Sequence, residues 1–366
     1  MGVEILWLMP ITPISVEKRP AYGSGDDCRK LIRTAQSLGM KVIIDWVANH
    51  TGYDHHWTVT FPHWYRKDAE GNFTKLYGWN DVIDLNYGIP EMRKEMIRFM
   101  QHWVEEFDID GVRCDMARTV PIDFWVEARG ECDAVNPLFW LAECEIPEYH
   151  EAFDVTYGWE AMRGMDKYLK GEGTRADIIP VLARCSGYPI GSKKLLFTSN
   201  HDENTYWGTE YEKYGVAAAA MAVFSCTWPG IPLVYSGQEK PKKRLSFFEK
   251  DFIDWKGDVA LHGFYEAMLR FRKRNKAFQE SASVIVLPSQ HPDVLVYLCR
   301  RQQDKVLVCL IFSLGKARLQ LNHPALRGTY RDLFSAGETA VERRYEQELD
   351  GGGYVVLHVT SENAGW

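Results

Sequence analysis

The sequence contains no apolar run long enough to span a bilayer, and no signal peptide is visible at its start. It also lacks a polybasic segment: 43 lysines and arginines stand against 50 aspartates and glutamates, which gives a formal net charge of −7 at pH 7. This acidic balance is not typical of proteins that bind nucleic acid or membrane surfaces. We therefore expect neither nucleic acid nor a membrane among the partners.

Paired cysteine motifs are absent as well. The eight cysteines are scattered, without CxxC pairs or the spacing of metal ligands. Cys114 and Cys144 fall in predicted buried strands, so we interpret them as small core side chains with free thiols. Free thiols favour a reducing compartment, but they do not decide the localisation.

The chain has no internal repeat and no low-complexity segment, and its 366 residues are too many for one small domain. Short apolar segments alternate with amphipathic helical segments up to about residue 280, which is typical of a parallel α/β fold. The predicted strands cover residues 5–8, 41–46, 111–115, 139–144, 153–156, 195–198 and 231–235.

The pattern changes after about residue 283, where short strands are separated by turns without convincing helices. We predict an antiparallel β domain over residues 281–366, most simply a sandwich, after an α/β domain over residues 1–280. Residues 51–90 are polar, aromatic and rich in histidine, and we interpret them as a small inserted subdomain or a long functional loop. The charged residues at 339–350 are interpreted as a solvated edge.

The segment from Phe107 to Ala117 contains two charged residues where a buried strand is expected. Arg113 and Asp115 are two positions apart, so on a strand their side chains point to the same face. A structural ion pair is one explanation, although a buried pair is weak evidence for stability. The other is catalytic, because parallel α/β barrels keep their chemistry at the carboxyl ends of the strands.

Polar groups follow four of the predicted strands at their carboxyl ends, where a barrel would bring them to one rim. Packing alone explains this poorly, because unpaired carboxylates that converge repel each other. The groups are Asp45 with Asn49 and His50, Arg113 with Asp115, Glu143, and Asn200-His201-Asp202.

These segments resemble the four ordered sequence signatures of the α-amylase family, glycoside hydrolase family 13. The resemblance extends over about residues 2–280 and is carried by residues 45–50, 111–115, 141–145 and 199–202, supported by 7–13 and 230–239. It implies a (β/α)8-type TIM barrel followed by a C-terminal antiparallel β-sandwich. The implied substrate is an α-glucan, and the implied chemistry requires no cofactor.

The resemblance also implies a role for each site residue. Asp115 would be the nucleophile, Glu143 the general acid and base, and Asp202 the stabiliser of the transition state. Arg113 would hold Asp115 ionised, and Asp45 would brace Arg113. His50 and His201 would hydrogen-bond sugar hydroxyls.

The residues themselves are consistent with double displacement and retention, which needs two carboxyl groups about 5–5.5 Å apart. We expect Arg113 to lower the pKa of Asp115, and we expect a raised pKa for Glu143, which has acidic neighbours and no cation on its own strand. Hydrolysis of α-1,4 bonds in starch or maltooligosaccharides is the leading interpretation. Transglycosylation, α-1,6 cleavage and a catalytically impaired glucan-binding relative remain open.

The sequence departs from the family pattern at its start. It begins at what the resemblance identifies as the second barrel strand, so the first strand and helix are missing from the predicted barrel. Either the sequence is a fragment, or the barrel closes with a gap, or another chain covers the opening. Because exposed sheet edges tend to pair with other chains, we expect a homodimer or another association that covers the open edge.

The sequence leaves two assignments undecided, an aromatic residue that stacks on the sugar and a calcium ligand. The loop from Pro13 to Asp26 is short, and Tyr22 is the single weak candidate there for the aromatic residue that stacks on the sugar. Asn49 matches a calcium ligand of the family, but no acidic partner set accompanies it, so a structural calcium ion is left open.

Overall fold

The computed structural model describes residues 1–11, 23–184, 188–189, 191–240, 244–246 and 251–359. The chain forms two compact units, one of Val3–Tyr157 and one of Met1–Gly2 with Gly158–Trp366. No helix among these residues is both long and apolar enough to cross a membrane.

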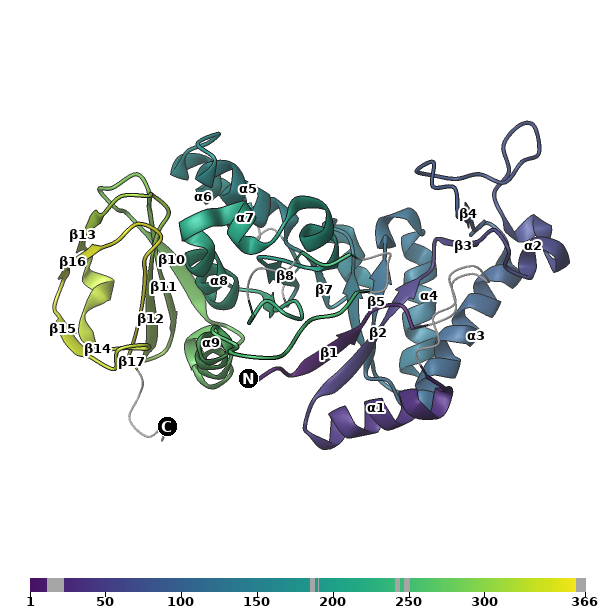
Figure 1. The fold of residues 1–366 in the computed structure, drawn as a ribbon, viewed down its shortest axis with the longest axis horizontal. Helices are drawn as coiled ribbons and strands as arrows, with labels where there is room; N and C mark the ends of the chain where they lie inside the picture. Colours follow the sequence, from purple (N-terminus) through teal and green to yellow (C-terminus); the bar gives the residue numbers. More distant parts are fainter. Residues whose placement is uncertain (12–22, 185–187, 190, 241–243, 247–250, 360–366) are drawn as a thin grey trace. The chain divides into compact units, whose positions relative to one another are not determined.

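The unit Val3–Tyr157 is built on parallel strands that lie in the order β1-β2-β5-β6-β7 (Figure 1). Their bounds are β1 Ile5–Leu8, β2 Lys41–Val47, β5 Gly111–Asp115, β6 Phe139–Ala142 and β7 Val155–Tyr157. Each corresponds to a strand predicted from the sequence, although β7 begins two residues later than expected. The helices between the strands are α1 Gly25–Ser37, α3 Pro90–Phe107 and α4 Ile122–Asp133.

Helix α1 shows how local sequence sets an element that supports the sheet. The Ser24 hydroxyl accepts a hydrogen bond from the Asp27 amide, and the Asp27 carboxylate accepts one from the Ser24 amide, which forms a capping box. Ile32 and Ala35 are buried on one face of the helix. Gly39 follows the end of the helix with φ near 80°, a conformation that glycine adopts without strain.

The segment between β2 and α3 contains the antiparallel pair β3 His50–Gly52 and β4 Val82–Asp84. Two short helices lie between these strands, α2 Trp57–Thr60 and the 3₁₀ turn η1 Pro62–Trp64. The pairing sets His50 opposite Asp84 and therefore fixes the position of a predicted site residue. Whether residues 51–90 act as a separate subdomain stays a prediction.

Short helical turns complete this unit. They are η2 Ala117–Thr119, directly after β5, and η3 Pro147–Glu151, after β6.

The second unit begins with helices and a parallel strand pair, β8 Lys193–Phe197 and β9 Ile231–Leu233. These two strands were also predicted from the sequence. The helical elements are α5 Trp159–Leu169, α6 Arg175–Arg184, the π-helical turn η5 Glu203–Trp207, α7 Glu210–Tyr214, η6 Gly215–Ala217, α8 Ala218–Thr227, α9 His262–Arg274 and η7 Lys276–Phe278.

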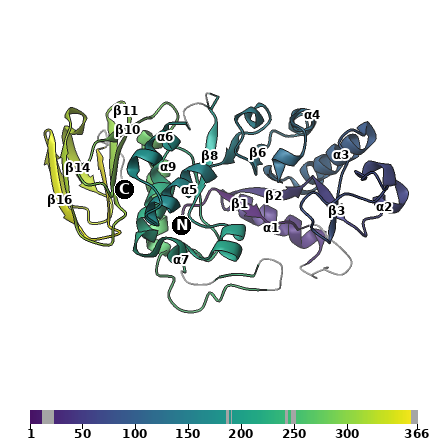
Figure 2. The same ribbon diagram turned by 90° about the horizontal axis from the view of Figure 1, so that it is seen from above.

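The C-terminal part of this unit is antiparallel (Figure 2). A six-stranded sheet has the order β10-β11-β12-β17-β14-β15, and β13 pairs with β16 in a second sheet. The bounds are β10 Ser283–Leu287, β11 Val294–Arg301, β12 Asp304–Ile311, β13 Ala317–Asn322, η8 Pro324–Leu326, β14 Gly328–Asp332, β15 Glu338–Val341, β16 Arg344–Leu349 and β17 Tyr354–Val359.

Strand β11 is apolar along nearly its whole length because both of its faces are buried. Val294, Val296 and Leu298 join a core shared by the two sheets. Leu295 and Tyr297 point the other way, into the core formed with α8 and α9. The predicted solvated edge at 339–350 is in fact largely strand, since it contains most of β15 and all of β16, whose side chains remain mostly exposed.

Candidate active site

Arg113 is the centre of the site in the unit Val3–Tyr157. It lies in the middle of β5, directly opposite Asp45 of the neighbouring strand β2. Its Nη1 atom donates to both Asp45 carboxylate oxygens, at 3.0 Å each. Both side chains are fully enclosed, with exposed fractions of 1% for Arg113 and 0% for Asp45.

The same guanidinium contacts the two carboxylates predicted to carry out the chemistry. Nη1 of Arg113 lies 2.7 Å from Oδ1 of Asp115, and Nη2 lies 3.0 Å from Oε2 of Glu143. Unlike Arg113, these two side chains are partly open, with exposed fractions of 20% and 12%. The buried cation therefore holds two carboxylates that solvent can reach.

Glu143 has no cation on its own strand, as expected, but it contacts one from outside that strand. The cation comes from the adjacent strand, because β5 and β6 pair in parallel with Arg113 opposite Leu141. Glu143 is held from a second side by the Met116 amide, which donates to Oε2 at 2.7 Å. Met116 has a left-handed backbone, with φ at 42°, directly after the strand. Strained backbone of this kind is frequent at functional sites.

One positive charge faces three carboxylates in this cluster, so the group carries a net charge of −2 when every member is ionised. Burial raises the pKa of Asp45 to about 6, and repulsion from Asp115 adds to this, although Arg113 and the hydrogen bonds oppose it. Burial lowers the pKa of Arg113, but the surrounding carboxylates outweigh burial and raise it overall. The arginine is thus fixed in its charged form, and a shortage of positive charge favours retention of a proton among the acids.

Two aromatic residues support Arg113 and were not identified from the sequence. Trp7 donates from Nε1 to Asp45 Oδ2 at 3.1 Å, and its ring lies 5.1 Å from the guanidinium carbon. Tyr157, at the end of β7, accepts a hydrogen bond from Arg113 Nε at 3.3 Å. Both stand on strands of the same sheet, so a search for polar groups on every strand, rather than for charges alone, would have found them.

His50 lies at the start of β3, and its ring meets that of Trp79 edge-on, with centroids 5.8 Å apart. Burial lowers the pKa of His50, while the charges of Asp115 and Asp84 oppose the shift. A neutral imidazole is suited to hydrogen bonding with hydroxyl groups.

Asn49, the residue tied to calcium by resemblance, is buried, and its Oδ1 atom has no hydrogen-bond partner. A free amide oxygen fits one calcium ligand. However, the described residues contain no group of three or more His, Cys, Asp or Glu side chains that could hold a metal ion. Asn49 is therefore a single candidate calcium ligand, and the chemistry described below uses no metal.

His201 and Asp202 belong to the other unit, where they follow strand β8. Asp202 comes directly before the turn η5, and its Oδ2 atom lies 3.3 Å from His201 Nε2. His201 is buried, whereas 41% of the Asp202 side chain is exposed. The buried histidine thus contacts a carboxylate that solvent can reach.

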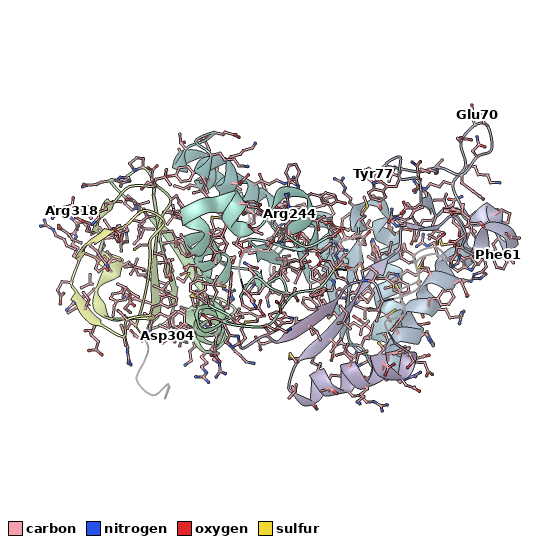
Figure 3. All side chains as sticks on the ribbon, viewed as in Figure 1. Phe61, Glu70, Tyr77, Arg244, Asp304 and Arg318 are labelled. Atoms are coloured by element: carbon pink, nitrogen blue, oxygen red, sulfur yellow. The ribbon has the colours of Figure 1, made fainter. Side chains whose placement is uncertain are left out.

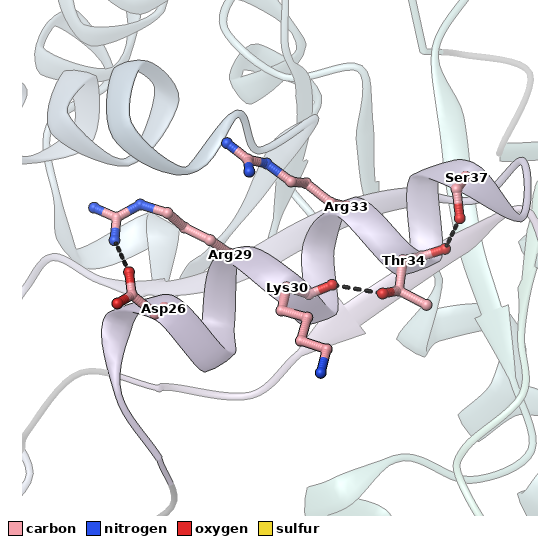
Figure 4. A pocket seen from close by; sticks show the side chains of 6 residues that line it. All are labelled: Asp26, Arg29, Lys30, Arg33, Thr34 and Ser37. Atoms are coloured by element: carbon pink, nitrogen blue, oxygen red, sulfur yellow. Dashed lines mark hydrogen bonds and ion pairs between the residues drawn. The ribbon is translucent and has the colours of Figure 1, made fainter.

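A separate shallow pocket lies on the surface of α1 (Figure 4). Its arginine Arg29 is already paired with Asp26, at 2.9 Å, and the Thr34 hydroxyl donates to the Lys30 carbonyl, at 2.7 Å. The pocket is therefore a solvated helix face, and it contains none of the predicted site residues.

The sequence also made predictions for Tyr22 and for the cysteines. Tyr22 lies outside the described residues. No disulfide joins the described cysteines, and Cys114 and Cys144 are buried as predicted, whereas Cys185 lies outside the described residues.

Comparison with known proteins identifies the family. A family model described as "Alpha amylase, catalytic domain" matches residues 1–61. The α-amylase MalA of Haloarcula japonica is 25% identical over 93% of this chain, and a maltogenic α-amylase of Bacillus acidopullulyticus is 30% identical over 93% of it. The chain spans 55% and 64% of the length of these two relatives. Names of other relatives include both glucan hydrolases and glucan transferases.

Among solved structures, the maltogenic α-amylase AmyB of Thermotoga neapolitana superposes with a TM-score of 0.88. The two chains are 27% identical, and the match covers 98% of this chain and 91% of that one. The fold class predicted from the sequence, a TIM-type barrel with a C-terminal antiparallel sandwich, is thereby confirmed. Taken with the cluster around Arg113, these matches show that the chain belongs to the α-amylase family, glycoside hydrolase family 13.

Proposed function

We propose that the protein hydrolyses α-1,4-glucosidic bonds of starch or maltooligosaccharides by double displacement, with retention of configuration. The observation that carries this proposal is the pair of partly exposed carboxylates, Asp115 and Glu143, on one buried guanidinium. Retaining glycosidases need two carboxyl groups close together, at about 5–5.5 Å. Contact with the two nitrogens of a single guanidinium keeps both groups near each other.

In the first step Asp115 attacks the anomeric carbon while Glu143 donates a proton to the departing glycosidic oxygen. The bond from the anomeric carbon to that oxygen breaks, and a glycosyl ester forms on Asp115. In the second step Glu143 takes a proton from water, the water oxygen attacks the anomeric carbon, and Asp115 is released.

Arg113 suits Asp115 to the nucleophilic role because its Nη1 donates a 2.7 Å hydrogen bond to Oδ1, which orients the carboxylate. Glu143 must instead carry a proton when the cycle begins. Its contact with Nη2, unlike that of Asp115 with Nη1, is not aligned as a hydrogen bond.

The family resemblance assigns the remaining roles. Asp202 is proposed to stabilise the oxocarbenium-like transition state, and its exposed carboxylate supports this role. His50 and His201 are proposed to bind sugar hydroxyls. No cofactor takes part in the proposed reaction.

The test compares Asp115→Asn and Glu143→Gln with the parent in a reducing-sugar assay on soluble starch. Both variants are expected to lose activity, for Glu143→Gln by about 10²–10⁴-fold, because general acid–base catalysis contributes that much. Maltooligosaccharide binding should survive in both. The control is Asp123→Asn, which changes an exposed carboxylate of α4 that is paired with Arg93, and it should retain parental activity.

Turnover close to the parent's in either purified site variant would overturn the catalytic assignment. A parent that binds glucan without cleaving it would instead favour the impaired relative. Product analysis on maltooligosaccharides and on pullulan separates hydrolysis from transglycosylation and from α-1,6 cleavage, which the same carboxylates can support.

A further inference from the structure

We propose that Trp79 and Tyr77 form an aromatic platform on which a glucose unit stacks beside the unit bound at Asp115 and Glu143. This inference rests on the proposed function and adds to it a second sugar-binding position. The platform belongs to the loop between η1 and β4 and lies within the same unit as the carboxylates.

The two rings are exposed although aromatic side chains are usually well buried. The exposed fractions are 44% for Tyr77 and 43% for Trp79, and the ring centroids lie 5.1 Å apart. Figure 3 shows Tyr77 at the surface. The planes are tilted by 37° rather than stacked face to face, so neither ring fully covers the other. The pair presents an apolar surface that remains available to a ligand.

Residues near the candidate active site contact both the Trp79 ring and the Tyr77 side chain. The Trp79 ring meets His50 in an edge arrangement, with an interplanar angle of 79°. The Tyr77 hydroxyl accepts a hydrogen bond from Arg118 Nη2 at 3.4 Å. Arg118 belongs to η2, the turn that begins two residues after Asp115. Rings held in place before binding lose little conformational freedom when a ligand arrives, which favours affinity.

These contacts place the platform next to the reacting groups. His50 follows Val47 of β2 by three residues, and Val47 is paired with Asp115 of β5. His50 thus stands near the end of β5 and contacts the Trp79 ring. A glucan bound at Asp115 would continue past His50 onto the rings, so the platform would bind a neighbouring unit rather than the unit being cleaved.

The chemistry of the surface suits a sugar. A pyranose ring has apolar C–H faces and polar edges, so it packs on an indole or phenol face while hydrogen bonds form around its rim. The Arg118 guanidinium and the Tyr77 hydroxyl provide polar groups at the edge of the platform. A flat apolar surface with polar groups at its edge fits carbohydrate better than a purely apolar ligand.

The experiment compares the parent with Trp79→Ala, Trp79→Phe and Leu76→Ala on maltotriose and on maltoheptaose. Leu76 is an exposed apolar residue of the same loop without a ring, so Leu76→Ala is the matched control. Loss of the indole should raise KM for maltoheptaose about tenfold with little change in kcat, and should change kcat/KM for maltotriose less than about twofold. Trp79→Phe should recover most of the loss, and Leu76→Ala should match the parent.

A merely structural role of Trp79, for example support of His50, would lower activity equally on short and long substrates. That outcome, or an unchanged KM for maltoheptaose in Trp79→Ala, overturns the platform while the proposed function stands. A parent that cleaves no α-glucan overturns the proposed function instead. Calorimetric titration with maltoheptaose then decides the platform: binding that Trp79→Ala weakens supports it, and binding that is absent or unaffected overturns it.

Discussion

At the scale of single residues, the site is governed by an imbalance of charge around Arg113. Asp45 is the most enclosed of the three carboxylates. Solvent does not stabilise its charge, so burial raises its pKa. Asp115 and Glu143 share the same cation but remain partly exposed. The arrangement keeps the cation fixed while leaving the two reactive acids reachable.

The raised pKa of Asp45 predicts a pH-dependent stability. The native state holds this proton up to about pH 6, whereas the unfolded chain releases it near the ordinary value of 3.8. Between these two pH values the native state binds more protons than the unfolded chain. The contribution of Asp45 to the free energy of unfolding is therefore complete below the unfolded pKa. It is lost as the pH rises through about 6. At 1.36 kcal/mol per pKa unit the loss is on the order of 3 kcal/mol.

The asparagine of the Asp45→Asn variant cannot titrate. The free energy of unfolding of this variant should therefore not show the decrease that Asp45 causes as the pH rises. Urea unfolding of both proteins from pH 3 to pH 7 measures the difference. The parent should lose stability relative to the variant as the pH rises. If the free energy of unfolding changed with pH in the same way in both proteins, Asp45 would have an ordinary pKa in the folded state.

At the scale of elements, the site depends on how closely β5 approaches its neighbours. Gly111 begins β5 and lies between Ile43 of β2 and Phe139 of β6. A Cβ atom at this position would lie 2.3 Å from the Phe139 carbonyl oxygen and 3.0 Å from Ile43. The absence of a side chain therefore allows the strand that carries Arg113 and Asp115 to pair on both sides.

Gly111→Ala should destabilise the protein by about 1–3 kcal/mol or more, because the strands must separate to admit the methyl group. Activity should fall with stability, since the displaced strand carries Arg113. Thermal unfolding measures the change. Gly130→Ala is the control: Gly130 lies inside α4 with no atom within 4 Å of an added Cβ, and the substitution should stabilise by about 0.5–1 kcal/mol. Equal effects of the two substitutions would contradict the close approach.

At the scale of the whole molecule, the association of chains remains a prediction. Strand β1 is at an edge of its sheet in the described part of the chain. Edge strands carry backbone groups that pair readily with another chain. We therefore expect a homodimer through this edge, with a solution mass about twice that of the chain by light scattering. A monomer mass at full activity, at every concentration measured, would contradict this expectation.

The positions of the parallel strands and of five antiparallel strands, β10 to β13 and β17, followed from sequence patterns. Strand β11 was predictable because its apolar run is continuous, and helix α1 because its apolar spacing ends at Gly39. Strands β3, β4 and β14 were not predicted. Strands β15 and β16 were missed as well, because their exposed, charged residues resemble a solvated edge. Their pairing partners, β14 and β13, decide that they are strands, and these contacts are not local.

The sequence by itself determined which residues could take part in the chemistry. Arg113 and Asp115 stand two apart on a strand, and strand geometry alone gives them a common face. The tertiary structure decided how these residues share charge: it brought Glu143 of the next strand's end to Arg113, added Trp7 and Tyr157 as supports, and enclosed Asp45. Strand pairing across long sequence separations and burial set these contacts, and the order of residues along one strand contains neither.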